Sequence, residues 1–320
     1  MSENSHKWYE TLIAGQVRER NKVRGSYLDE TMVTGDEHAG VIKFPVVSGT
    51  IEVYKVSGAI QPVKTSNATL DTVPIQTDEY EASTYIKTRD LRKQGPNEQA
   101  AVSREISKAI AFKKDKLKLD AVAAFAEVGS PHLTDGPTTV ETIGDGTTRI
   151  DLIDMIEAAS RIFGTGIEEG VYWPIPEVFM DQLEMYKEFA NADYIGSKDL
   201  PFARMDNVRK RTFRRVHIMT LPDKYFYHGT GAFGAGEGHL PFSEDGYLDT
   251  FMWCKEAMGA QMDWYRETVE VREQFQLEGS PLLAKAGLDG AAIGVLPEMV
   301  KRLRFKAQNR AVRPEPVAAP

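Results

Sequence analysis

The chain has 320 residues and a formal net charge of −8, because 47 acidic side chains outnumber 39 basic ones. This charge argues against a protein whose whole surface holds nucleic acid, although it leaves room for local basic patches. The 42% hydrophobic content suffices for a packed core, no apolar run approaches the ~20 residues of a membrane span, and a single cysteine excludes an internal disulfide.

The N-terminal residues 1–45 predict a short helix and an extended arm, with few side chains that could fill a core of their own. The first ten residues show no signal-peptide pattern, which favours a soluble protein made in a reducing compartment. Basic side chains gather at one place in the arm, where they could face DNA or another acidic partner. They are Arg18, Arg20, Lys22 and Arg24.

Residues 46–88 predict a β-hairpin of two long strands. Val, Ile, Thr and Tyr dominate this stretch, and glycines and prolines interrupt it. A two-stranded hairpin is only marginally stable in water, so it must lie on the rest of its own chain or on a neighbouring subunit.

Residues 97–128 predict one long helix. Asn97 is the expected N-cap, and Gly129 ends the helix. At 1.5 Å per residue it would be about 48 Å long. Its basic middle adds Lys113 and Lys114 to the side chains that could face DNA or an acidic partner. Apolar residues recur at helical spacing, namely Val102, Ile106, Ala109, Ile110, Leu117, Ala121, Ala124, Phe125 and Val128.

The rest of the chain predicts a mixture of helices and strands. The stretch "DLIDMIEAASRIFG" predicts a helix, "GVYWPIP" a strand and "PEVFMDQLEMYKEFAN" a second helix. "RRVHIMTLP" and "KYFYH" predict short strands, and one long strand is expected near residues 262–275. The basic and then Pro/Ala-rich end of the chain predicts a loose tail.

Two stretches invite a chemical interpretation. Gly229, Gly231 and Gly234 match a dinucleotide-binding fingerprint, but Pro241 stops the helix that would have to follow, so a tight or flexible turn is the better interpretation. The basic run from Arg204 to Arg215 favours ion pairs with an acidic partner surface over contact with phosphate.

No other pattern predicts catalysis or metal binding. His217, His228 and His239 lack the close spacing of a metal site. Cys254 is a lone thiol of the kind that commonly acts as a small buried hydrophobe. We therefore expect no catalytic residue, no cofactor, no metal and no enzyme activity.

Four stretches resemble segments of the major capsid proteins of tailed bacteriophages, in the same order over residues 40–275. They are "LDTVPIQTDEYEASTYI", "EVFMDQLEMYKEFANADYIGSKDLPF", "KYFYHGTGAFGAGEG" and "AMGAQMDWYRETVEVR". None is a catalytic motif, and their shared order carries the resemblance. The family implies an α+β fold with an N-terminal arm, an extended hairpin loop, a peripheral domain with a long spine helix, and an axial domain.

The resemblance assigns a stretch of this chain to each unit of the capsid fold. It also implies that the glycines at 229–238 let the chain turn tightly within the axial domain. The expected units are the arm at 1–45, the extended loop at 46–88, the peripheral domain with its spine helix at 89–129, the axial domain at 130–255, the return strand of the peripheral domain at 256–276 and a C-terminal extension at 277–320. The extended loop is expected to contact neighbouring subunits through Lys55, Lys64, Asp71 and Pro74.

The implied function is structural: a major capsid protein that assembles into an icosahedral shell around double-stranded phage DNA. The expected partners are its own copies in hexamers and pentamers, a portal protein, packaged DNA held non-specifically, and a separate scaffolding protein, since the arm has no room for a fused one. No membrane is expected; assembly would take place in the host bacterial cytoplasm, and the final location is the virion. Two alternatives stay open: an encapsulin-like nanocompartment with the same fold and, more remotely, a nucleotide-binding enzyme that uses the glycine loop 229–238.

Overall fold

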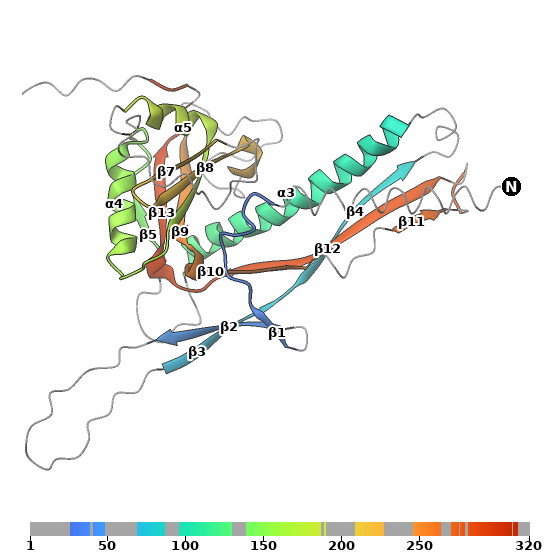
Figure 1. The fold of residues 1–320 in the computed structure, drawn as a ribbon, viewed down its shortest axis with the longest axis horizontal. Coiled ribbons are helices and arrows are strands. Elements are labelled where there is room, and N and C mark those ends of the chain that lie inside the picture. The colour runs from blue at the N-terminus through green and yellow to red at the C-terminus, as the bar shows by residue number, and fades with distance from the viewer. Residues whose placement is uncertain are drawn as a thin grey trace, which may run out of the picture.

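The structure is a computed structural model, and its described part is elongated, with a helix-flanked sheet at one end and a long helix beside a long sheet toward the other (Figure 1). Among the described residues, no helix is both long and apolar enough to cross a membrane. The structure describes residues 26–38, 41–48, 69–86, 96–129, 139–186, 189, 209–226, 246–263, 270–274, 276–278, 281–308 and 310–312.

A six-stranded mixed sheet forms the larger core, in the order β5-β13-β9-β6-β8-β7. The β13–β5 and β6–β8 pairs are parallel, and the other pairs are antiparallel. The central strand β6 is buried along its whole length, as its continuous apolar sequence "VYWPIP" requires. The elements are β5 (Glu141–Ile143), α4 (Leu152–Phe163), β6 (Val171–Pro176), α5 (Glu177–Glu184), β7 (Lys210–Phe213), β8 (Val216–Leu221), β9 (Tyr247–Cys254) and β13 (Val300–Lys306).

The long sheet is built around β12, which pairs with β4 on one side and with β10 and β11 on the other. Alternate residues of β12 are buried, which is the two-residue period of a strand with one covered face. On that face Leu282, Ala284, Ala286 and Leu288 pack in one cluster with Ile106 and Ile110 of the long helix. The strands are β4 (Asp78–Ile86), β10 (Met258–Asp263), β11 (Glu270–Glu273) and β12 (Leu282–Gly294).

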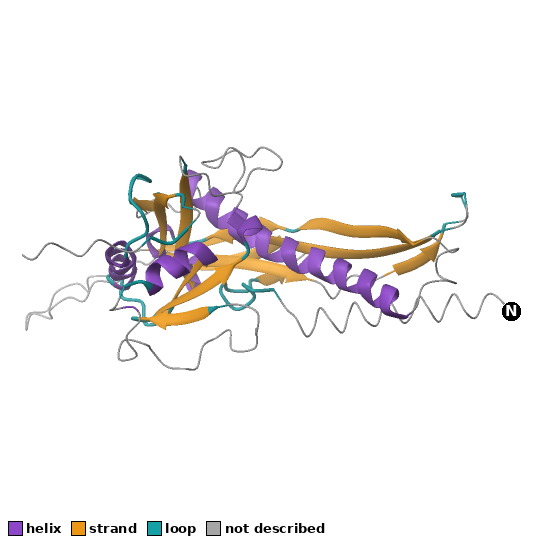
Figure 2. Ribbon diagram, turned by 90° about the horizontal axis from the view of Figure 1, so that it is seen from above, coloured by secondary structure: helices purple, strands orange, loops and turns teal. Residues whose placement is uncertain are grey.

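The long helix α3 spans Pro96–Val128 and lies along this sheet (Figure 2). The predicted helix is confirmed, although it begins one residue earlier than expected, with Asn97 inside its first turn. It ends as predicted at Gly129, which has a φ of 78° and donates its N–H to the carbonyl of Phe125 at 2.8 Å.

The predicted apolar stripe of α3 is only partly the buried one. Ile106 and Ile110 are buried, but Val128 is 74% exposed, and Leu119 and Val122 are buried in its place. The reason is that α3 packs on the long sheet with its first half and joins the larger core with its second half. A single stripe cannot serve two partners on different sides of a helix.

A third sheet contains the predicted hairpin. β2 pairs with β3 as expected, but the hairpin begins at Val41, and the predicted return strand continues into β4, which belongs to the long sheet. The base of the hairpin is covered by its own chain, because Phe44 and Val73 pack with Val295. This base therefore does not depend on a neighbouring subunit. The strands are β1 (Asp36–His38), β2 (Val41–Ser48) and β3 (Thr69–Gln76).

Three predictions about segments in the C-terminal third of the chain are wrong. Residues 277–320 are not a mere extension, because β12 is the centre of the long sheet and β13 lies inside the six-stranded one. The segment "KYFYH" begins not as a strand but as the 3-10 helix η2 (Asp223–Phe226). The long strand expected at 262–275 is two strands, β10 and β11, with residues 264–269 outside the described part.

The N-terminal arm also ends earlier than predicted. Residues 26–33 belong to the larger core, where Leu28 is fully buried and Met32 nearly so. Val33 donates its N–H to the carbonyl of Met258 at 3.0 Å and accepts from Ala260 at 2.9 Å, which ties the segment to β10. Only residues before Ser26 are left as a candidate arm.

Candidate functional site: a buried polar anchor and the predicted contact residues

The structure places two of the four predicted loop-contact residues on one edge strand. Asp71 and Pro74 lie in β3, where they are paired with Val46 and Lys43 of β2. Pro74 is exposed, and an edge strand tolerates a residue that has no N–H. Lys55 and Lys64 lie outside the described residues.

Of the six predicted DNA- or scaffold-facing residues, two lie within the described part of the structure and four lie outside it. Lys113 and Lys114 are half-buried on α3, and both have contacts within the subunit. The ammonium of Lys113 lies 4.2 Å from the ring centroid of Tyr80 on β4, a favourable cation–π distance. The other four lie outside the described residues and are Arg18, Arg20, Lys22 and Arg24.

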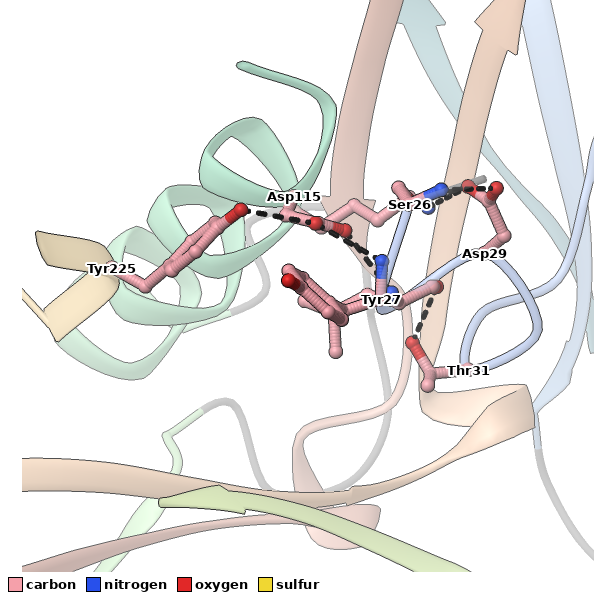
Figure 3. A network of polar contacts seen from close by, with 8 residues as sticks. Ser26, Tyr27, Asp29, Thr31, Asp115 and Tyr225 are labelled. Atoms are coloured by element: carbon pink, nitrogen blue, oxygen red, sulfur yellow. Dashed lines mark hydrogen bonds and ion pairs between the residues drawn. The ribbon is translucent and has the colours of Figure 1, made fainter. Parts of the chain in front are cut away.

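The best-formed polar site is an anchor that fixes residues 26–31 to the middle of α3 (Figure 3). Asp115 is fully buried, and its two carboxylate oxygens accept the N–H groups of Tyr27 and Leu28, each at 3.0 Å. The hydroxyl of Tyr225, from η2, lies 3.5 Å from the same carboxylate. Asp115 thus satisfies two backbone donors at the start of a turn, as an N-cap side chain does for a helix.

Lys118, one helical turn further along α3, completes the anchor. Its ammonium is buried and donates to Asp29 at 2.9 Å and to the hydroxyl of Ser26 at 3.2 Å. On the other side of the turn, the hydroxyl of Thr31 donates to the carbonyl of Leu28 at 2.9 Å. Ser26, Asp29 and Thr31 of this turn therefore each have a side-chain partner within the subunit.

Ionisation in the anchor follows from burial and from these partners. Burial raises the pKa of Asp115 to about 6, although Lys118 and the two backbone donors oppose the change. Burial also raises the pKa of Tyr225, and the nearby Asp115 carboxylate adds to this effect. For Asp29, burial alone would raise the pKa, but Lys118 and the hydrogen bonds from Ser26 lower it below its ordinary value.

The sequence interpretation did not single out Asp115 or Lys118, because it treated the lysines of this stretch as surface cations. One signal was present. Asp115 stands four and seven residues before the buried Leu119 and Val122, on the same side of α3. An acidic residue at helical spacing within an apolar stripe indicates a buried partner.

The basic run from Arg204 to Arg215 forms ion pairs, but the acidic surface is its own subunit's α5. Arg209 contacts Glu177, and it contacts Asp181 at 2.6 Å and Glu184 at 2.5 Å. The first five residues of the run lie outside the described part. The predicted acidic partner surface is therefore not needed for Arg209.

The described residues that could carry chemistry, Cys254 and His217, lie in environments typical of structural residues. Cys254 is fully buried, and burial raises the pKa of its thiol to about 11, which keeps it un-ionised at neutral pH. His217 places Nδ1 3.0 Å from the hydroxyl oxygen of Thr212. His228 and His239 fall outside the described residues, and the described residues contain no cluster of three or more metal-ligating side chains.

The glycine run 229–238 also lies outside the described residues, but the segment before it is described. A dinucleotide fingerprint needs a strand directly before its first glycine. Here β8 ends at Leu221, and Asp223–Phe226 forms a 3-10 helix. The approach to the glycines thus lacks the expected strand.

Comparison with known proteins gives one consistent result. A family model described as phage capsid protein matches residues 8–306. The capsid of cyanophage P-SCSP1u has a TM-score of 0.58 at 15% identity, over 88% of each chain. The capsid of Ralstonia phage GP4 has a TM-score of 0.58 at 9% identity, over 93% of this chain and 92% of its own.

A third structure, the mature capsid of bacteriophage PhiM1, has a TM-score of 0.55 at 13% identity, over 88% of this chain and 87% of its own. No curated protein sequence matches the chain. At these identities the solved structures establish a common fold, which confirms the predicted α+β capsid fold.

Proposed function

The chain belongs to the phage capsid protein family and is a structural major capsid protein, and from this we propose that its copies close into an icosahedral shell around double-stranded phage DNA. The family match over residues 8–306 carries the proposal. The final location would be the virion, after assembly in the host bacterial cytoplasm, and no catalytic step would be needed.

Exposed apolar side chains at two ends of the molecule support self-association. Ile153, at the start of α4, is 67% exposed, and Met185, at the end of α5, is 43% exposed. These two helix ends lie near each other, because Asp151, after burial, contributes to the raised pKa of the Tyr186 hydroxyl. Single exposed apolar residues are ordinary on a protein surface, but their presence at more than one place is compatible with contacts to different neighbours, as a closed assembly requires.

The far end of the long sheet offers a second such place. Tyr85 of β4 is 59% exposed and is paired with Leu283 of β12. Leu277, in the connection from β11 to β12, is also exposed. Each contact would be modest, but many simultaneous contacts in a closed shell reinforce one another.

We assign a further contact to the extended hairpin, whose expected contact residues are Lys55, Lys64, Asp71 and Pro74. Deleting residues 57–68 would remove its end and stop directly before β3, which begins at Thr69. Because the base of the hairpin packs on its own chain, the shortened subunit should fold but fail to close into shells. Normal shells from this deletion would contradict the assignment.

The charge of the subunit indicates how it would contact the remaining expected partners, packaged DNA and a scaffolding protein. A subunit with a net charge of −8 repels DNA on average, so contact with packaged DNA should be weak, insensitive to sequence and strongly weakened by salt. We assign this contact, and transient contact with a scaffolding protein, to the basic residues of the arm and of α3. Since Lys113 and Lys114 have partners within the subunit, the four arm residues should contribute more. A portal protein would complete the shell.

Expression of the protein with and without a neighbouring scaffold gene tests the proposal. Electron microscopy should show open or aberrant shells from the subunit alone and uniform closed shells when the scaffold is present. Only small oligomers under both conditions would contradict a shell function. Uniform shells from the subunit alone would refute the separate scaffold.

The contents of the particles decide between the alternatives. Particles from an infected host that contain DNA support a phage shell, whereas particles filled with one enzyme support an encapsulin-like compartment. A nucleotide that co-purifies with the isolated subunit in equal amounts would favour the enzyme. We expect no such nucleotide, because the described approach to the glycine run lacks the strand of a dinucleotide site.

A further inference from the structure

An aromatic ring sits where the base of the β2–β3 hairpin meets the rest of the subunit. Phe44, in the middle of β2, is 3% exposed, and its ring lies against two glycines from other segments. A methyl group on Gly259 of β10 would stand 2.5 Å from the ring atoms Cε1 and Cζ, and one on Gly35 would stand 2.8 Å from Cε1. Since ordinary carbon contacts are about 3.5–4.0 Å long, the ring fits only because both side chains are absent.

Backbone conformation does not explain these two glycines. Neither Gly35 nor Gly259 has a φ in the left-handed region that favours glycine. Gly259 lies in a regular strand pair, opposite Ile293 of β12. Glycine weakens the interior of a strand and often marks a place where another group comes close to the backbone. At this place the ring of Phe44 is that group.

Hydrogen bonds hold the walls of this seat together. Val33, two residues before Gly35, donates its N–H to the carbonyl of Met258 at 3.0 Å and accepts from the N–H of Ala260 at 2.9 Å. The two bonds lie on either side of Gly259 and form a β-bridge between it and Val33. The backbone segments that carry the two glycines are therefore fixed to each other, and the space between them is set before the ring enters it.

Apolar contact, rather than hydrogen bonding, joins the hairpin to the two larger sheets. In the described part of the chain, the backbone hydrogen bonds of β2 and β3 run only between these strands and to β1, so the three form a sheet of their own. Their contact with the rest of the subunit is a cluster of Ile42, Phe44, Val46 and Val73 with Val295. Because apolar contact has no preferred direction, the shape of the seat decides how the hairpin is oriented.

We propose that Phe44 is a positioning residue for assembly: its ring, seated on Gly35 and Gly259, sets the direction in which the hairpin leaves the subunit. The inference rests on the proposed function, because this direction matters where the hairpin of one copy meets a neighbouring copy. A methyl group at position 259 would displace the ring by about 1 Å before ordinary contact distances return. Since β3 continues into β4, which begins at Asp78, that end of the hairpin stays in place and the hairpin turns.

Shell formation by the full chain with Gly259→Ala, expressed together with the neighbouring scaffold gene, tests this role. Circular dichroism should show a folded subunit. Electron microscopy should show a yield of closed shells at least about tenfold below that of the unmodified chain, because the same error recurs at every copy of the contact. Phe44→Leu shortens the displaced side chain, so adding it to the Gly259→Ala chain should recover shells. Gly35→Ala should lower the yield in the same way as Gly259→Ala.

Gly294→Ala is the matched control for loss of stability. Gly294 is also a buried glycine of the long sheet without a left-handed φ, but the ring that its methyl group would meet, at 2.0 Å, belongs to Phe125 of α3. The free energy of unfolding in urea should fall at least as much for Gly294→Ala as for Gly259→Ala, while shells of Gly294→Ala should keep their normal yield and diameter. Equal loss of shells from the two variants would show a purely structural role for Phe44 and would refute the proposal.

Phe44→Ala gives a second measurement that does not overpack the seat. The apolar cluster of the hairpin base is separate from the larger core, so loss of the ring should leave both larger sheets folded. With the seat empty, the hairpin has no fixed direction, and shells should form in lower yield and with mixed diameters. Normal shells from Phe44→Ala or from Gly259→Ala would refute the positioning role and leave the proposed function intact. If the unmodified chain forms no shell with or without the scaffold, the proposed function itself is refuted.

Discussion

Replacing Asp115 by asparagine removes the charge from the buried anchor and keeps the size of the side chain. In the native protein the carboxylate accepts the N–H groups of Tyr27 and Leu28 and lies near the ammonium of Lys118. These partners favour the ionised form, while complete burial disfavours it. Burial is the larger effect, so the pKa of Asp115 rises from 3.8 to about 6.

This shift fixes the sign of a pH-dependent term in stability. Between about pH 4 and pH 6 the folded protein binds a proton on Asp115 more readily than the unfolded chain does. Protonation of Asp115 therefore adds to the free energy of unfolding at low pH, and this contribution is lost as the pH rises through about 6. At 1.36 kcal/mol per pKa unit, the change from 3.8 to about 6 corresponds to about 3 kcal/mol. Asparagine does not titrate and lacks this term.

An amide offers one acceptor oxygen, and so does the protonated carboxyl of Asp115 at low pH, whereas only the ionised carboxylate offers two for the N–H groups of Tyr27 and Leu28. At low pH the native protein and the Asp115→Asn variant should therefore be similar in stability. As the pH rises to about 6 the native protein loses its pH-dependent term, so near neutral pH the variant should be the more stable of the two.

Urea unfolding of the unassembled subunit, from about pH 4.5 to about pH 7.5, measures both free energies of unfolding. The free energy of unfolding of the native protein minus that of the variant should fall by about 2 kcal/mol over this range, because only the part of the change between pH 4.5 and about 6 lies within it. Taking the difference removes the contribution of other titrating groups. Asp120→Asn, on the same helix and about half exposed, controls for the loss of one charge. A difference that stays constant or grows with pH would show that Lys118 and the backbone donors outweigh burial, and it would refute the reasoning.

Three further predictions concern single side chains. Arg214 has a φ of 46° in the turn between β7 and β8, a backbone conformation that glycine adopts without strain. Arg214→Gly should therefore raise the free energy of unfolding by about 1 kcal/mol in the same urea assay, and a decrease would contradict this. A methyl group on Gly294 would meet the ring of Phe125, so Gly294→Ala should cost about 1–3 kcal/mol, and Phe125→Leu in the same chain should recover part of it. Cys254 should resist thiol reagents in the folded protein and react after unfolding; rapid labelling of the folded protein would show that its burial and raised pKa do not protect it.

The parts of the fold that the sequence predicts are those with a strong local pattern. α3 has a long apolar period and a glycine stop, and both are found where expected. The order α4, β6, α5 is also predicted correctly, because "VYWPIP" is a continuous apolar strand between two amphipathic stretches. β12 was missed because "LLAKAGLDGAAIG" is rich in alanine and glycine, which have low strand propensity. Its pairing with β4 on one side and with β10 and β11 on the other makes it a strand.

The anchor could not be predicted as a site for a different reason. Asp115 binds backbone donors that are 87 and 88 positions away in the chain, and a backbone N–H leaves no mark in the sequence. Lys118 stands among other lysines and is one of the few that is buried. Which member of a basic run is buried depends on the segment that packs over it, and this is a property of the fold.

The connection between the two larger sheets bears on how copies of this subunit can differ within one shell. Besides the passage from β4 through α3 to β5, the chain crosses between the sheets through Lys255–Ala257 from β9 to β10 and through Pro297–Met299 from β12 to β13. The crossings are bonded to each other, since Val295 and Leu296 both donate to the carbonyl of Ala257, at 2.8 and 3.2 Å. A bend between the sheets would have to distort two chain segments together and break these bonds. If the proposed shell places copies of the subunit at different angles, these copies should therefore differ less in the angle between the two sheets than in the hairpin of β2 and β3.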